Sequence, residues 1–255
     1  ILAFVLTTLL PAIVTHEAAG LLPTVFLWPA ENPPFLQPGW TLIYELWFYL
    51  GFGFLMLAPR RLLGALLMGW ALAVIVAALR FGLDTHPVLH VVTNPLTLNF
   101  LMGALLALAL AAWRTQVPPG ALVGLMALST LMLLAGAYYV TETGWNEWTR
   151  MLACGPASAV MLAAAALMDR QGMLRPPAAL VTLGDWSYAL YLVHQPIVYA
   201  VTLLCAKLLG VGWAGVAAAT ALGLSLPFLA TVAIHHWVEK PAQNAGRVLA
   251  SRFKS

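Results

Sequence analysis

Residues 62–79 read LLGALLMGWALAVIVAAL, a run without a charged side chain that lies between Arg61 and Arg80. As an α-helix this run is about 27 Å long, close to the ~30 Å hydrocarbon core of a bilayer. Lipid offers no partner to backbone N–H and C=O groups, and a helix satisfies these groups within one segment. The run therefore predicts a transmembrane helix.

Apolar runs of this kind recur along the whole chain of 255 residues. Each is bounded by charged residues or by clusters of proline and glycine, and none shows the ~10-residue alternating segments of a membrane β-barrel. We therefore predict an all-α fold, a polytopic bundle of about eight transmembrane helices. The expected segments are 1–14, 40–58, 62–79, 96–113, 120–140, 151–168, 184–206 and 212–236.

The composition excludes several classes of protein. Hydrophobic residues make up 62% of the chain and charged residues 8%, against about 45–50% and about 25% in soluble domains. The same figures exclude intrinsic disorder, which requires a low content of apolar residues. The net charge of +3 comes without a polybasic stretch, so nucleic acid is not an expected partner.

Small residues inside the apolar runs are expected to serve packing. Cys154 and Cys205 lack the number and spacing of a disulfide framework or a metal site. Gly120 and Gly124 have the small-xxx-small spacing that lets membrane helices approach closely. We therefore expect core packing at the cysteines and helix contact at the glycines.

Basic residues alternate between the connections and predict the orientation, because cytoplasmic loops carry the excess of Lys and Arg. Nine of them fall in one set of connections and three in the other, which places the first set and the C-terminus in the cytoplasm. We interpret 1–240 as one transmembrane domain and 241–255 as a short cytoplasmic tail. The first set is Arg60, Arg61, Arg114, Arg170, Arg175, Lys240, Arg247, Arg252 and Lys254; the second is Arg80, Arg150 and Lys207.

Residues 15–39 are expected to form the longest connection on the non-cytoplasmic side. Five prolines in this stretch, Pro23 the first of them, are expected to keep it from being helical. The segment either covers a site that faces outward or serves as a rigid connector, and the sequence leaves both interpretations open.

The first polar motif is the stretch 40–49, WTLIYELWFY, which opens one of the expected helices. Glu45 is a carboxylate inside a membrane span, and insertion scales give a cost on the order of 2.5–3.5 kcal/mol for a comparable Asp at mid-membrane. Thr41, Glu45 and Tyr49 share one helical face, so a polar stripe is expected to point into the bundle. Glu45 either belongs to a working site or pairs structurally with a basic group on another helix.

The second polar motif is the stretch 184–196, GDWSYALYLVHQP. Ser187, Tyr191 and His194 fall on one helical face, and Pro196 is expected to kink the helix just after them. This face suits the lining of a cavity or a proton relay, since a histidine takes up and releases protons near neutral pH. The alternative is a hydrogen-bonded packing seam between helices.

The remaining histidines carry weaker signals. His86 and His90 are four residues apart, but Pro87 disfavours a helix there and no acidic residue completes a metal-binding pattern. His235 and His236 end the last span, where the membrane interface accounts for them. We therefore predict no metal site.

Three short motifs together give the chain a resemblance to the integral-membrane acyltransferase-3 family. They are the tryptophan-to-tyrosine stretch 40–49, the stretch 183–196 from Leu-Gly-Asp to His-Gln-Pro, and Val-Glu-Lys-Pro at 238–241. Each motif is short, but the three occur in the family's order across about 200 residues. The resemblance to the exopolysaccharide branch is the strongest.

The resemblance implies ten helices with both ends in the cytoplasm, so the expected eight correspond to the last eight of ten. The missing front would hold the family's membrane-embedded histidine and its Arg-x-x-Arg pair, and neither is found here. This chain alone is then expected to be catalytically incomplete. Asn99 also departs from the family, since relatives often place glutamate at that position.

By resemblance, the full-length protein transfers an acyl group, usually acetyl, from cytoplasmic acyl-CoA to a sugar hydroxyl of an exopolysaccharide or another cell-surface glycan. It would act in the bacterial inner membrane with acyl-CoA as a donor substrate and no bound cofactor. Glu45 is the catalytic candidate, because it can orient or charge the missing histidine. The expected lining of the substrate path is Trp40, Thr41, Tyr49, Ser187, Tyr188, Tyr191 and His194.

The arginines expected on the cytoplasmic side have two possible roles. They can meet the phosphates of CoA, or they can serve only to orient the helices. The five arginines concerned are Arg60, Arg61, Arg114, Arg170 and Arg175.

A transporter or flippase for a glycan or lipid is the alternative from another functional class. In that case Glu45 and His194 would move protons and no covalent chemistry would occur. Transporters are typically built from internal repeats with broken helices in paired positions, and the sequence shows neither.

Overall fold

The computed structural model describes residues 21–32, 34, 39–82, 86–144 and 146–252. Within these ranges the secondary structure is helical and contains no strand, which confirms the all-α prediction. The expected first segment, 1–14, lies outside the described residues. Each of the other seven expected segments coincides with a helix.

The chain divides into two compact units, one formed by Ile43–Arg175 and the other by Ile1–Leu42 together with Pro176–Ser255. The boundary falls inside helix α3 (Gly39–Leu55), so the first polar motif contributes residues to both units.

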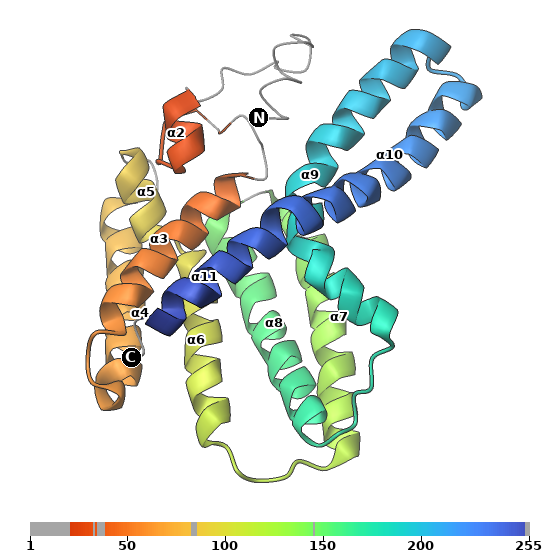
Figure 1. Ribbon diagram of the computed structural model, residues 1–255. Coiled ribbons are helices and arrows are strands. Elements are labelled where there is room, and N and C mark those ends of the chain that lie inside the picture. Colours follow the sequence, from red (N-terminus) through yellow and green to blue (C-terminus); the bar gives the residue numbers. More distant parts are fainter. Residues whose placement is uncertain (1–20, 33, 35–38, 83–85, 145, 253–255) are drawn as a thin grey trace. The chain divides into compact units, whose positions relative to one another are not determined.

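The unit Ile43–Arg175 is a set of helices that pack pairwise (Figure 1). Helix α7 packs along α8, while α6 contacts both α4 and α8. The aromatic ring of Phe48 on α3 stacks on Phe100 and Trp70, with ring centroids 4.8 and 5.5 Å apart. The helices are α4 (Arg60–Phe81), α5 (Pro87–Thr93), α6 (Thr97–Ala112), α7 (Pro119–Thr143) and α8 (Glu147–Arg170).

The other unit holds the C-terminal helices, in which α9 lies along α10 (Figure 1). Helix α9 continues through Pro196, and its ribbon changes direction part-way along (Figure 1). A short π-helix, η2, follows α10 directly and leads into α11. The bounds are α9 (Ala178–Leu209), α10 (Trp213–Ile234), η2 (His235–Glu239) and α11 (Lys240–Arg252).

Six helical stretches of the described chain are long and apolar enough to cross a membrane. Helix α3 has 17 residues and is shorter than any of these six. The last stretch runs without a break into the residues predicted to be a tail, which are helical as α11. The six stretches are Arg60–Phe81, Pro87–Ala112, Pro119–Thr143, Glu147–Arg170, Ala178–Leu209 and Trp213–Val248.

Two expectations about proline were wrong. Helix α2 (Leu21–Phe26) lies within the stretch predicted to be free of helix and contains Pro23, and α5 begins at Pro87. The physical reason is the same in both places. The first N–H groups of a helix have no partner within the helix, so proline loses no hydrogen bond there.

The glycine pair expected to mediate helix contact does not do so among the described residues. A Cβ built on Gly120 or Gly124 would meet no other atom within 4 Å. The close approach of α7 and α8 occurs instead at Gly136, where a Cβ would lie 2.5 Å from the carbonyl oxygen of Ala153. The spacing of glycines therefore indicated the correct helix but the wrong position.

We expect Gly136→Ala to lower the free energy of unfolding by about 1–3 kcal/mol, because the added methyl group overpacks the contact of α7 with α8. Gly124→Ala on the same helix is the matched control and should be neutral or stabilising by up to about 1 kcal/mol. Titration of the purified protein with a denaturing detergent measures both. Equal stability of the two variants would contradict the close approach at Gly136.

Candidate functional site

A hydrogen bond joins the first two polar motifs. The hydroxyl oxygens of Thr41 on α3 and Tyr191 on α9 are 2.9 Å apart, although the residues are 150 positions apart in the sequence. Both belong to the same compact unit. Two of the residues predicted to line the substrate path are therefore in direct contact.

His194 lies beside this contact, one turn further along α9. Its ring centroid is 5.9 Å from that of Tyr191, and its Nδ1 lies 2.8 Å from the carbonyl oxygen of Tyr191 and 3.2 Å from that of Leu190. A carbonyl oxygen only accepts, so Nδ1 must carry the proton that makes these bonds. In the neutral ring Nε2 is then the basic nitrogen, which is the form that a general base requires.

The other predicted residues of α9 do not share in this contact. The Ser187 hydroxyl donates to the carbonyl oxygen of Gly184 at 2.7 Å, a bond within its own helix. Tyr188 is half exposed. From the second polar motif, Tyr191 forms a hydrogen bond to the first motif.

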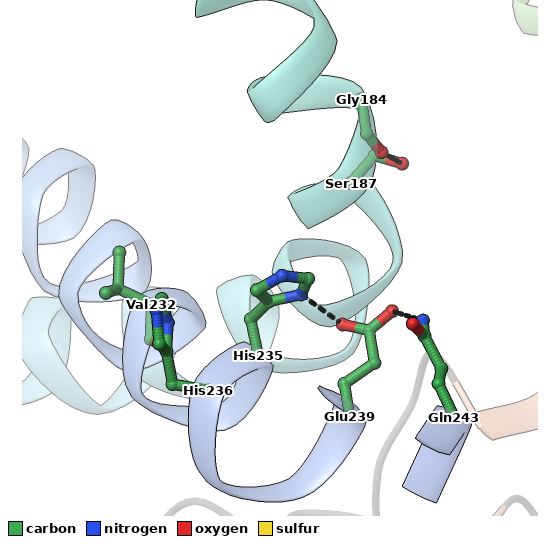
Figure 2. Close-up of polar contacts among 7 residues, drawn as sticks. All are labelled: Gly184, Ser187, Val232, His235, His236, Glu239 and Gln243. Atoms are coloured by element: carbon green, nitrogen blue, oxygen red, sulfur yellow. Dashed lines mark hydrogen bonds and ion pairs between the residues drawn. The ribbon is translucent and has the colours of Figure 1, made fainter. Parts of the chain in front are cut away.

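The third motif forms a buried polar contact that the sequence analysis did not anticipate. Nδ1 of His235 lies 2.9 Å from a carboxylate oxygen of Glu239, and the other carboxylate oxygen accepts a hydrogen bond from the side-chain amide of Gln243 at 3.1 Å (Figure 2). His235 and Glu239 are the first and last residues of the π-helix η2. Short π-helical segments within α-helices occur frequently at functional sites.

The two neighbouring histidines expected at the membrane interface differ in their burial. His235 is buried, whereas His236 is exposed and bonds through Nδ1 to the carbonyl oxygen of Val232 (Figure 2). The sequence did contain a signal for the contact between His235 and Glu239. His235 and Glu239 have the i, i+4 spacing that brings side chains together on a helix.

The indole ring of Trp186 connects the second motif to the third. Its centroid lies 6.4 Å from that of the His235 ring, in a tilted arrangement. Within this unit, contacts therefore link all three motifs. Thr41 of the first motif bonds to Tyr191 of the second, and Trp186 of the second lies beside His235, the partner of Glu239 in the third.

The central carboxylate of the first motif, Glu45, is half buried on α3. No hydrogen bond or ion pair joins it to any residue that the structure describes, so the structural pairing considered for it has no partner there. The polar stripe does not continue inward to Tyr49, which is 59% exposed, whereas Phe48 is buried. Trp40 is half buried at the start of the same helix.

A second polar cluster surrounds Tyr44, the residue before Glu45. The fully buried Asn94 donates from its amide to the Tyr44 hydroxyl oxygen at 3.2 Å and lies 3.4 Å from Nε2 of His90. Its amide oxygen accepts from the backbone N–H of Leu96 at 2.9 Å. Asn94 was not predicted, because a single asparagine before a proline is typical of an ordinary turn.

Asn99, where the family resemblance leads us to expect glutamate, lies on α6. Its amide oxygen is buried and has no hydrogen-bond partner among the described residues. Nowhere in the ranges that the structure describes do three His, Cys, Asp or Glu residues come together in a group that could hold a metal ion.

Comparison with known proteins identifies the family of this chain. The model of the acyltransferase-3 family, described as an acyltransferase domain, matches residues 1–232. The chain belongs to this family. The match confirms the resemblance drawn from the three motifs, and with the six apolar helices it makes the chain a multi-pass membrane protein.

Two curated relatives are similar to this chain over most of its length. It is 27% identical to the exopolysaccharide production protein ExoZ of Rhizobium meliloti, over 89% of this chain and 70% of the relative. It is 31% identical to the acyltransferase MdmB of Streptomyces mycarofaciens, over 87% of this chain and 63% of the relative. No solved structure matches the chain.

Proposed function

We propose that the full-length protein is a membrane O-acyltransferase that transfers an acyl group, in our proposal acetyl, from acyl-CoA to a hydroxyl of an exopolysaccharide or another cell-surface glycan. The observation that carries this proposal is the acyltransferase domain match across residues 1–232. The similarity to the exopolysaccharide production protein ExoZ supports the glycan acceptor. The charge distribution supports acyl-CoA entering from the cytoplasmic face of the bacterial inner membrane, where the C-terminus also lies.

The chemistry requires a base and a group that stabilises negative charge. The acceptor hydroxyl oxygen attacks the thioester carbonyl, the C–S bond breaks, and the hydroxyl proton leaves through the base while CoA departs as the thiol. In this proposal Glu45 orients or charges the histidine that the family resemblance implies. The hydrogen-bonded side chains of Thr41 and Tyr191, together with the neighbouring His194, line the acceptor path.

Acyl transfer by purified protein tests the proposal. Full-length protein in vesicles is incubated with radiolabelled acetyl-CoA and extracted glycan, and label in the glycan is measured together with free CoA. We expect both products to appear at equal rates. Glycan that crosses the vesicle membrane without gaining label and without CoA release would instead show a transporter.

A further inference from the structure

A polar pocket lies between the ends of α6 and α8, at two of the five arginines whose charge either orients the helices or meets phosphates. Its volume is about 420 Å³, within the range of small-molecule sites. The loop that follows α6 passes beside the end of α8 in this unit (Figure 1). The polar side chains that line the pocket are Arg114, Thr115, Gln116, Arg170 and Gln171.

One of the two arginines is held in place by the fold. Nη1 of Arg170 donates to the carbonyl oxygen of Leu110 in the last turn of α6 at 2.6 Å. The indole N–H of Trp113 donates to the carbonyl oxygen of Thr115 at 2.7 Å and so fixes the loop that carries Arg114. A guanidinium has five N–H donors, so Arg170 keeps most of its donors after this bond.

Within the described ranges, neither positive charge is neutralised. Among the described residues no carboxylate forms an ion pair with Arg114 or Arg170. Asp169 precedes Arg170 but does not line the pocket. Two guanidinium groups beside one cavity repel each other, and an anion bound between them would remove this repulsion.

We propose that this pocket binds a phosphate group. Guanidinium groups bind phosphate oxygens through paired hydrogen bonds, and the amides of Gln116 and Gln171 supply further donors beside them. The pocket lies at the ends of two helical stretches, Pro87–Ala112 and Glu147–Arg170, that are long enough to cross a membrane, and basic pockets between such helices also bind lipid head groups. The phosphate therefore comes from a nucleotide such as CoA or from an anionic phospholipid.

Binding measurements on Arg114→Gln test the proposal. This variant removes a charge without removing a hydrogen bond of the described structure, so its folding should be intact. Full-length protein in phosphatidylcholine nanodiscs is titrated with CoA and with inorganic pyrophosphate. We expect Arg114→Gln to weaken the binding of at least one probe about tenfold or more. Arg247→Gln on α11, an exposed arginine predicted on the same membrane side, is the matched control and should bind as the parent does.

A lipid arm distinguishes the two sources of phosphate. The parent protein and the variants are placed in nanodiscs that contain phosphatidylglycerol, and the lipid that stays bound is measured by native mass spectrometry. If only Arg114→Gln retains less phosphatidylglycerol, the pocket binds a lipid head group. Weaker CoA binding with unchanged lipid retention would assign it to the nucleotide. Equal binding of CoA, pyrophosphate and phosphatidylglycerol by the parent and the variant would overturn the proposal.

The CoA arm of the proposal rests on the proposed function, but the two fail separately. Binding is measured without acyl transfer, so a protein that acylates glycan but binds all three probes equally with or without Arg114 refutes the pocket alone. Arg170→Lys provides a second variant, since it keeps the charge at α8 and should retain more binding than Arg170→Gln.

Discussion

Full-length protein with Glu45→Gln is expected to transfer acyl groups about 100-fold more slowly than the parent, or not measurably. Glutamine has nearly the same shape as glutamate but neither accepts a proton nor carries the negative charge that would orient a histidine. The described structure offers Glu45 no ion-pair partner whose loss would unfold the protein. The rate of label transfer from acetyl-CoA to glycan, at equal abundance in the membrane, measures the effect.

The control for this experiment is the same chemical change at an exposed carboxylate. Glu142 lies near the end of α7 and is exposed, so Glu142→Gln should leave the rate unchanged. If Glu45→Gln also acylated glycan at the parental rate, Glu45 would be a structural carboxylate and its catalytic assignment would be wrong. A stable but inactive Glu45→Gln protein supports the assignment.

Glu239→Ala is expected to lower the free energy of unfolding by about 1–3 kcal/mol, because it leaves the buried Nδ1 of His235 without its hydrogen-bond partner. Glutamine can still accept this bond through its amide oxygen, so Glu239→Gln should cost less than Glu239→Ala. Titration with a denaturing detergent measures both variants. The change is structural and does not depend on the proposed function.

A double-mutant cycle separates the His235–Glu239 contact from other effects of the substitutions. In the protein with both His235→Leu and Glu239→Ala no buried group is left unsatisfied, so the double variant should be less destabilised than the sum of the single variants. Gln243→Ala removes only the outer hydrogen bond of Glu239 and should have a small effect. Additive effects of the two single variants would show that the contact contributes nothing.

Sequence periodicity predicted the helices well because each membrane helix satisfies its own backbone. The run 62–79 has no polar group and little choice of conformation in lipid, and the structure extends it only slightly, to Arg60–Phe81. Proline was the source of error, because its effect depends on its position in a helix. At Pro23 and Pro87 it lies in the first turn, and composition alone does not reveal where a helix begins.

The candidate site was predictable as a set of motifs but only partly as a set of contacts. The sequence singled out Thr41, Tyr191 and His194, and the structure brings the first two within hydrogen-bonding distance. It did not indicate Asn94 or the buried state of His235. Both depend on which residues are covered by neighbouring parts of the fold, and this burial is not a local property of the sequence.

The amino-acid sequence by itself determined that this is an all-helical membrane protein of the acyltransferase-3 family, because hydropathy and short motifs are local properties of the chain. Tertiary structure alone decided which polar groups meet. The contact of Thr41 with Tyr191 spans 150 positions, and Gly136 rather than Gly124 faces α8. The physical reason is that lipid makes each helix form independently, whereas side-chain packing between helices selects their contacting faces.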